Sequence, residues 1–142
     1  MYLSPTGKLD VRGPDLWARS GGYFGASRIH KGRDSIHKGL DLIIPPGRDI
    51  VASGYGIYHR TGICYSGDLR YLKCVFIFDV TVRMNILYMW PRLIKGTKFK
   101  RGDVIGTVQD LSARYPKIIN HVHVEVVVRG RRVDPMRYLE VA

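Results

Sequence analysis

Five histidines occur in the sequence, and two groups among them have the residue types and spacing of metal ligands. The first group is His37-Lys-Gly-Leu-Asp41, an imidazole and a carboxylate four residues apart. The second is His121-Val-His123, inside the apolar run HVHVEVVV. If that run is a strand, His121, His123 and Glu125 share one face, and Val122, Val124 and Val126 line the other. Imidazoles and a carboxylate are costly to bury without a partner, so the pattern predicts a metal.

Zinc is the metal that this donor set favours. It binds imidazole nitrogen and carboxylate oxygen, and its catalytic sites keep three protein ligands and leave one position for water. An H-x-H pair alone also occurs in solvent-facing strands without a metal, and an H-x-x-x-D pair alone carries less weight. The two pairs together, both beside apolar segments, predict one zinc ion per chain.

Short strands must position these groups. From residue 23 onward, β-branched and aromatic runs alternate with turns rich in glycine and proline, namely DLIIPPG, DIVAS, GYGIYHRTGICY, YLKCVFIFDVTV, NILYMW, DVIGTVQ and HVHVEVVV. This alternation predicts an all-β, compact antiparallel domain with little helix, in short pieces around residues 111–115 and 135–139. Residues 1–20 are interpreted as an N-terminal arm, ordered on contact or loose, and residues 21–142 as the domain.

The chain is strongly basic, with 23 Lys and Arg against 12 Asp and Glu and a formal net charge of +11. This balance favours an anionic partner such as a cell-wall polymer. The densest segment contains Lys95, Lys98, Lys100 and Arg101, which form either a polyanion-binding face or a solvated loop beside a strand. No module for specific nucleic-acid recognition is found.

The ends and the cysteines allow further expectations. No apolar run approaches the roughly 20 residues of a membrane span, and the start MYLSPTGKLDVRGPDLW does not look like a secretory signal. Cys64 and Cys74 flank the turn SGDLRY, and a hairpin centred near residue 69 would place them opposite each other. A disulfide and two free thiols are both consistent with this spacing.

Four segments in order resemble the LytM or lysostaphin-type metallopeptidase domain: GGYFGASR, HKGLDLIIPPGRDIVAS, KGTKFKRGDVIGTV and HVHVEVVVRGRRVDPMRYL. The family pattern runs FGxR, HxGxD, PxGxxIxA, GxxVxxGxxIG, HxHxE and PxxYL, and the match extends over roughly residues 21–139. The resemblance implies an antiparallel sheet with a groove, and zinc at its floor held by His37, Asp41 and His123. It implies that His121 is a catalytic residue beside the metal. The implied substrate is peptidoglycan, at an extracytoplasmic site: periplasm, cell wall or phage particle.

Within this group, YMWPRLIKGTKFKRG and RYPKIINHVHVE are most similar to the leukocyte cell-derived chemotaxin branch. Active peptidases of this type carry another histidine in a YxH segment, where this chain has Tyr88-Met89-Trp90. Indole donates one hydrogen bond but cannot carry a proton at neutral pH. His59 is a candidate substitute, and His30 is expected in a loop. We therefore expect a zinc metalloendopeptidase impaired by Trp90, or alternatively a catalytically silent, zinc-containing binding module; the oligomeric state stays open.

Overall fold

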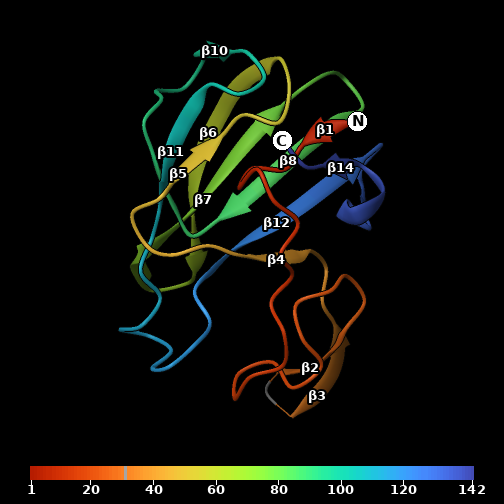
Figure 1. Ribbon diagram of the computed structural model, residues 1–142, viewed down its shortest axis with the longest axis vertical. Coiled ribbons are helices and arrows are strands. Elements are labelled where there is room, and N and C mark those ends of the chain that lie inside the picture. Colours follow the sequence, from red (N-terminus) through yellow and green to blue (C-terminus); the bar gives the residue numbers. More distant parts are fainter. Residues whose placement is uncertain (31) are drawn as a thin grey trace.

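The computed structural model describes residues 1–30 and 32–142, and strands dominate these residues (Figure 1). The strands are β1 (Tyr2–Leu3), β2 (Ser27–His30), β3 (Arg33–Ile36), β4 (Leu40–Ile43), β5 (Asp49–Val51), β6 (Gly56–Tyr65), β7 (Asp68–Ile77), β8 (Val82–Leu87), β9 (Met89–Pro91), β10 (Lys98–Phe99), β11 (Val104–Val108), β12 (His121–Val128), β13 (Arg131–Val133) and β14 (Leu139–Glu140). A single 3-10 turn, η1 (Pro135–Arg137), is the helical element of the described residues. The all-β prediction is confirmed.

A seven-stranded antiparallel sheet forms the body of the domain. Its strands run in the order β10-β6-β7-β8-β12-β13, and β4 pairs with β12 beside this path. A smaller antiparallel sheet, in the order β5-β11-β9, lies across one part of it (Figure 1). The exception to antiparallel pairing among the described strands is the parallel contact of β1 with β14.

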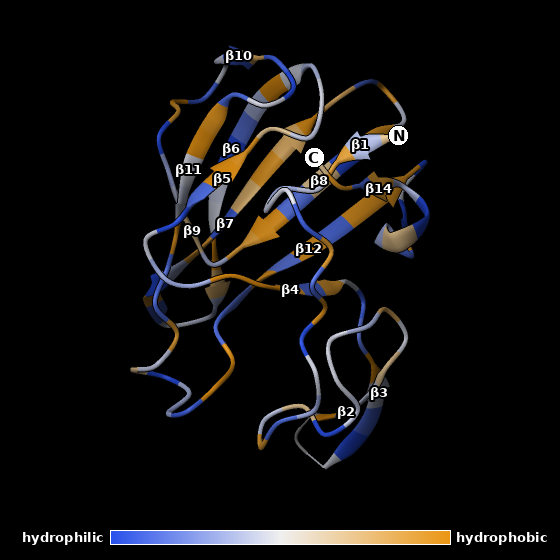
Figure 2. Cartoon of the chain, in the orientation of Figure 1, coloured by the Kyte–Doolittle hydropathy of each residue, from blue (hydrophilic) through white to orange (hydrophobic). Residues whose placement is uncertain are grey.

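The core lies between the two sheets. It joins Ile50 of β5 and Ile105 of β11 to Phe76 and Ile86 of the large sheet, all at most 2% exposed. Figure 2 shows the hydrophobic residues gathered on the strands of these sheets and hydrophilic residues on β3. Burial of these side chains is the main stabilising contribution, at about 25 cal/mol per Å² of apolar surface.

The first twenty residues lie against the body of the domain. Tyr2 and Leu3 pair with β14, and Val11 forms an antiparallel bridge with Leu42 of β4. The boundary at residue 20 stays a prediction, but the contacts of this segment are with the domain itself. Its polar residues therefore belong in the description of the site.

Two short-range predictions are wrong. Residues 111–115 form turns rather than a helix, and His30 ends strand β2 instead of lying in a loop. The β6–β7 hairpin turns at Ser66 and Gly67, because Gly67 supplies a left-handed φ of 81°.

The disulfide alternative is also contradicted. Cys64 and Cys74 are free thiols. With the turn at residues 66–67 and not near 69, the strand register places Cys74 opposite Thr61. Cys64 lies three residues further along β6, so the two sulfur atoms do not face each other.

Candidate metal centre

Two adjacent strands position the predicted ligands. In the antiparallel register of β4 and β12, Asp41 lies directly opposite His123. Leu40 and Leu42 on one strand, and Val122 and Val124 on the other, are fully buried in the core. Strand alternation therefore turns Asp41, His121 and His123 to the opposite face.

Three ligand atoms from this face and the preceding loop form a small triangle. His37 Nε2 lies 3.0 Å from His123 Nδ1 and 3.2 Å from Asp41 Oδ1. His123 Nδ1 lies 3.0 Å from Asp41 Oδ1. Ligands at about 2.05 Å from a tetrahedral zinc are separated by about 3.3 Å, so the triangle has nearly the required size. The fold therefore brings together the three residues that the sequence predicts as ligands, and their chemistry fits a divalent metal such as zinc.

Hydrogen bonds fix which ring nitrogen of each histidine is available. His37 Nδ1 lies 3.0 Å from the carbonyl oxygen of Tyr23, and His123 Nε2 lies 3.0 Å from Glu125 Oε2. Both partners only accept hydrogen bonds, so these nitrogens carry hydrogen. When both rings are neutral, the lone pairs of His37 Nε2 and His123 Nδ1 are therefore directed into the triangle. Such outer partners orient metal-binding histidines and raise their basicity.

The charges of this cluster are strongly coupled. Burial opposes the protonation of His123, but its hydrogen bonds to Asp41 and Glu125 raise its pKa to about 9. Burial also favours neutral carboxyls, yet the hydrogen bond from His123 is the main cause that lowers the pKa of Glu125, to about 2. The pKa of Asp41 falls well below its usual value against the same desolvation, through hydrogen bonds from His123 and His37. Metal binding must therefore displace a proton from His123.

His121 lies beside the triangle without joining it. Its Nδ1 donates to the carbonyl oxygen of Ile119 at 2.7 Å, and its Nε2 lies 3.7 Å from Asp41 Oδ2. Burial lowers the pKa of His121, so the ring is neutral at pH 7. Its Nε2 consequently keeps a lone pair that can accept a proton.

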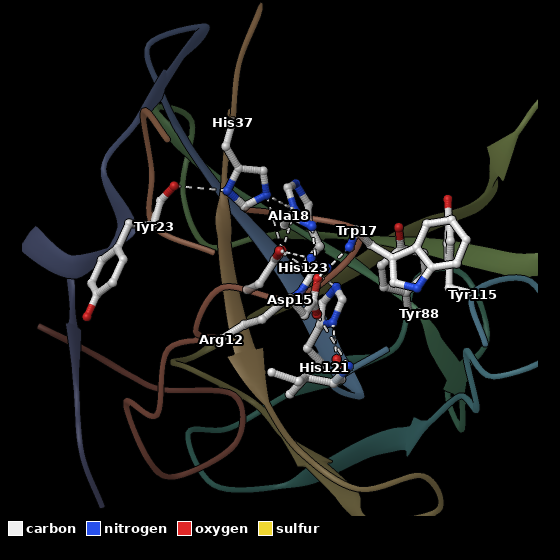
Figure 3. Close-up of polar contacts among 12 residues, drawn as sticks. Arg12, Asp15, Trp17, Ala18, Tyr23, His37, Tyr88, Tyr115, His121 and His123 are labelled. Carbon is white, nitrogen blue, oxygen red and sulfur yellow. Dashed lines mark hydrogen bonds and ion pairs between the residues drawn. The ribbon is translucent and has the colours of Figure 1, made fainter. Parts of the chain in front are cut away.

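A cavity of about 270 Å³ opens over these groups. Figure 3 shows the histidine cluster on one side and the rings of Trp17, Tyr88 and Tyr115 on the other. The indole of Trp17 donates to the carbonyl oxygen of Pro116 at 3.1 Å and meets the Tyr115 ring edge-on at 5.0 Å. The lining is completed by Arg12, Arg28, Leu87 and Ile118. This cavity is the groove that the resemblance implies.

Tyr88, which the sequence reasoning missed, comes from the segment where a histidine was expected. It has a left-handed φ of 75°, and its ring meets that of His121 edge-on at 5.6 Å. Its hydroxyl lies 2.5 Å from that of Tyr65, which accepts from Tyr115 at 2.7 Å. In the sequence, an aromatic residue of a strand that lines a cavity cannot be distinguished from one that packs in the core.

Trp90 and His59 lie elsewhere. Trp90 is 51% exposed on β9, opposite Thr107 of β11, and it is outside the described lining of the cavity. His59 is exposed on β6 and is likewise absent from that lining. Among the described residues, His121 is thus the one histidine of the cavity besides His37 and His123.

The predicted basic face lies at the far end of the domain. Lys98 is in β10, at the opposite end from β2 and β3, while Asp41 and His123 lie on β4 and β12 (Figure 1). Lys95 and Lys100 are exposed beside it, but Arg101 is paired with Glu140 at 2.8 Å. The structure therefore brings these four residues near one another and not to the candidate metal centre.

Comparison with other proteins finds two curated relatives. No protein-family model matches the chain. The chain is 28% identical over 132 residues to the peptidoglycan DD-endopeptidase ShyC of Vibrio cholerae, covering 90% of this chain and 29% of that protein. It is 29% identical over 138 residues to myeloid protein 1 of Gallus gallus, covering 92% and 38%. The chain thus spans less than two fifths of either curated relative.

Solved structures share the fold. A zinc-containing peptidase from Vibrio cholerae superposes with a TM-score of 0.66 at 24% identity, over 96% of this chain and 40% of that one. The catalytic domain of lysostaphin from Staphylococcus simulans gives 0.62 at 21% identity, over 82% and 87%. The domain therefore has the lysostaphin-type fold. Its relatives and structural neighbours include a peptidoglycan endopeptidase, a zinc-containing peptidase and lysostaphin, in agreement with the family that the sequence motifs resemble.

Of the two curated relatives, ShyC acts on peptidoglycan by its name. In the described part of the chain, none of the helical structure is long and apolar enough to cross a bilayer.

Proposed function

We propose that this domain is a zinc-dependent endopeptidase acting on peptidoglycan peptides, with zinc held by His37, Asp41 and His123. The observation that carries the proposal is the triangle of their ligand atoms, 3.0–3.2 Å apart, facing a cavity beside a neutral His121. Zinc at this position would polarise a peptide carbonyl and lower the pKa of water toward about 7. The similarity to ShyC supports the substrate class.

The protein's own groups would share the remaining work. His121 Nε2 would accept a proton from the attacking water and return it to the leaving amine. Its hydrogen bond to Ile119 keeps the ring oriented for this transfer. Trp17, Tyr88 and Tyr115 would bind the peptide along the other wall of the cavity. Because one imidazole would serve where the resemblance implies two, we propose slow turnover.

The alternative is a zinc-containing binding module of the chemotaxin type that does not hydrolyse peptides. The exposed Trp90 and the similarity to myeloid protein 1 favour it. In that case the zinc would stabilise the fold, and the cavity would bind a partner without turnover.

Zinc-dependent release of peptides from purified peptidoglycan decides between the two. We expect slow release by the wild type, and loss of release in His121→Ala with zinc content unchanged. His59→Ala is the matched control, because His59 is exposed on β6 and should leave the rate unaffected. No release by a zinc-loaded wild type would favour the binding module, and equal release by His121→Ala would remove His121 from the reaction.

A further inference from the structure

One buried arginine from the N-terminal segment touches the candidate metal centre. Arg12 is 4% exposed, and its guanidinium contacts two carboxylates at once. Nε and Nη2 donate to the two oxygens of Asp15 at 2.9 and 2.7 Å. Nη1 donates to Asp41 Oδ2 at 3.0 Å. The rigid fork of arginine suits this double contact, which a lysine cannot reproduce.

We infer that Arg12 is a positioning residue for the metal. It holds one carboxylate oxygen of Asp41, so that only the other oxygen can ligate the metal. The inference rests on the proposed zinc site. Asp41 Oδ1 is the oxygen within 3.0 and 3.2 Å of the histidine nitrogens, while Oδ2 is the oxygen that Arg12 binds. With Oδ2 engaged by Arg12, Asp41 would offer a single oxygen to a bound metal.

The backbone holds the same contact in place. Arg12 N donates to Asp41 O at 2.9 Å, Asp41 N donates to Gly22 O at 2.8 Å, and Gly22 N donates to Arg12 O at 2.8 Å. A Cβ on Gly22 would lie 2.6 Å from Asp41 Cβ and 3.0 Å from Arg12 Cβ. A closed ring of three hydrogen bonds thus joins the segment around Arg12 to the ligand strand at close range. Residues predicted as an arm therefore contact the candidate metal centre.

Asp15 fixes Arg12 in turn. Its Oδ1 also accepts from the backbone N–H groups of Trp17 and Ala18, both at 2.8 Å. Among the described residues, the only other arginine near Asp41 is Arg28. Its Nη2 lies 3.7 Å from Asp41 Oδ2. That separation exceeds a hydrogen bond, so Arg28 does not replace the orienting contact of Arg12.

Zinc affinity of the full chain tests the inference without relying on activity. We would measure zinc dissociation constants by competition with a chromogenic chelator for the wild type, Arg12→Gln, Arg12→Lys and Arg19→Gln. Partners that orient metal ligands typically contribute 10–100-fold in affinity, so both Arg12 variants should bind zinc about 10–100-fold more weakly. Arg19 is exposed in the same segment, and Arg19→Gln should retain wild-type affinity.

Cobalt substitution reports the coordination that a merely structural role would not change. We expect the strong visible absorption of four-coordinate Co²⁺ in the wild type, and weaker bands in Arg12→Lys as Asp41 ligates through both oxygens. Circular dichroism of the zinc-free proteins would test whether Arg12→Lys is folded, which we expect because the lysine keeps a positive charge between the two aspartates.

The outcomes separate this inference from the proposed function. Wild-type zinc affinity and cobalt spectrum in a folded Arg12→Lys would overturn the positioning role and leave the zinc site standing. A wild type that binds no zinc would overturn both. Weaker zinc binding with an altered cobalt spectrum would support the inference even if no peptide is cleaved.

Discussion

Glu125→Gln is the sharpest test of how the protein prepares His123 for a metal. Glu125 is 8% exposed, accepts hydrogen bonds from His123 and Asn85, and forms an ion pair with Arg132. Oε2 contacts His123 Nε2 at 3.0 Å, while Oε1 contacts Asn85 Nδ2 at 2.9 Å and Arg132 Nε at 3.2 Å. A carboxylate satisfies all of them because both its oxygens are acceptors.

Glutamine has the same shape but only one acceptor oxygen. If that oxygen faces His123, the amide NH₂ faces the donors of Asn85 and Arg132. If the amide is reversed, its NH₂ faces His123 Nε2, and the imidazole hydrogen moves to Nδ1, the atom needed by the metal. Either orientation weakens the site. Loss of such an orienting partner typically costs 10–100-fold in metal affinity, or about 1.4–2.8 kcal/mol.

The assay is the zinc dissociation constant by chelator competition, with unfolding measured in parallel. Glu140→Gln is the control, since it removes a carboxylate from an exposed ion pair with Arg101. Exposed pairs contribute about 0–1 kcal/mol, and the control should bind zinc normally. A folded Glu125→Gln with a zinc dissociation constant within about twofold of the wild type would refute the reasoning, because the expected loss is at least about tenfold.

Three further predictions concern pH, packing and charge. In protein stripped of zinc by a chelator, the raised pKa of His123, about 9, stabilises the fold fully below about pH 6.5. This contribution, about 3 kcal/mol, should be lost as the pH rises through 9. The free energy of unfolding measured in urea should therefore decline with pH in the zinc-free protein but not in the zinc-bound protein. Parallel pH profiles of the two forms would contradict this prediction. Gly39→Ala would place a Cβ 2.6 Å from His123 Nε2, so we expect about 1–3 kcal/mol of destabilisation and weaker zinc binding. Gly13→Ala, where no atom lies within 4 Å of the added carbon, should be close to neutral in the same thermal unfolding assay. Finally, charge reversal at the exposed Lys95, Lys98 and Lys100 should weaken binding to wall material at low salt, and unchanged sedimentation with that material would identify the segment as a solvated loop.

The sequence by itself determined the strand class and the ligand candidates. The alternation in HVHVEV, residues 121–126, fixes which side chains share a face, because successive residues of a strand point to opposite sides. The same alternation in LDLI separates Asp41 from Leu40 and Leu42. Residue type then limits the chemistry, since two imidazoles and a carboxylate fit zinc in either a peptidase or a binding module.

Tertiary structure decided what surrounds those ligands. The contact of Arg12 with Asp41 spans 29 positions, and that of Glu125 with Asn85 spans 40, so no local period reveals either. The hairpin turn at Gly67 set the register that keeps Cys64 and Cys74 apart. The path of β9 turned Trp90 outward, whereas Tyr88, two residues earlier, lines the cavity. These outcomes depend on which strands meet and in which register, and only the packing of the whole core selects among such long-range pairings.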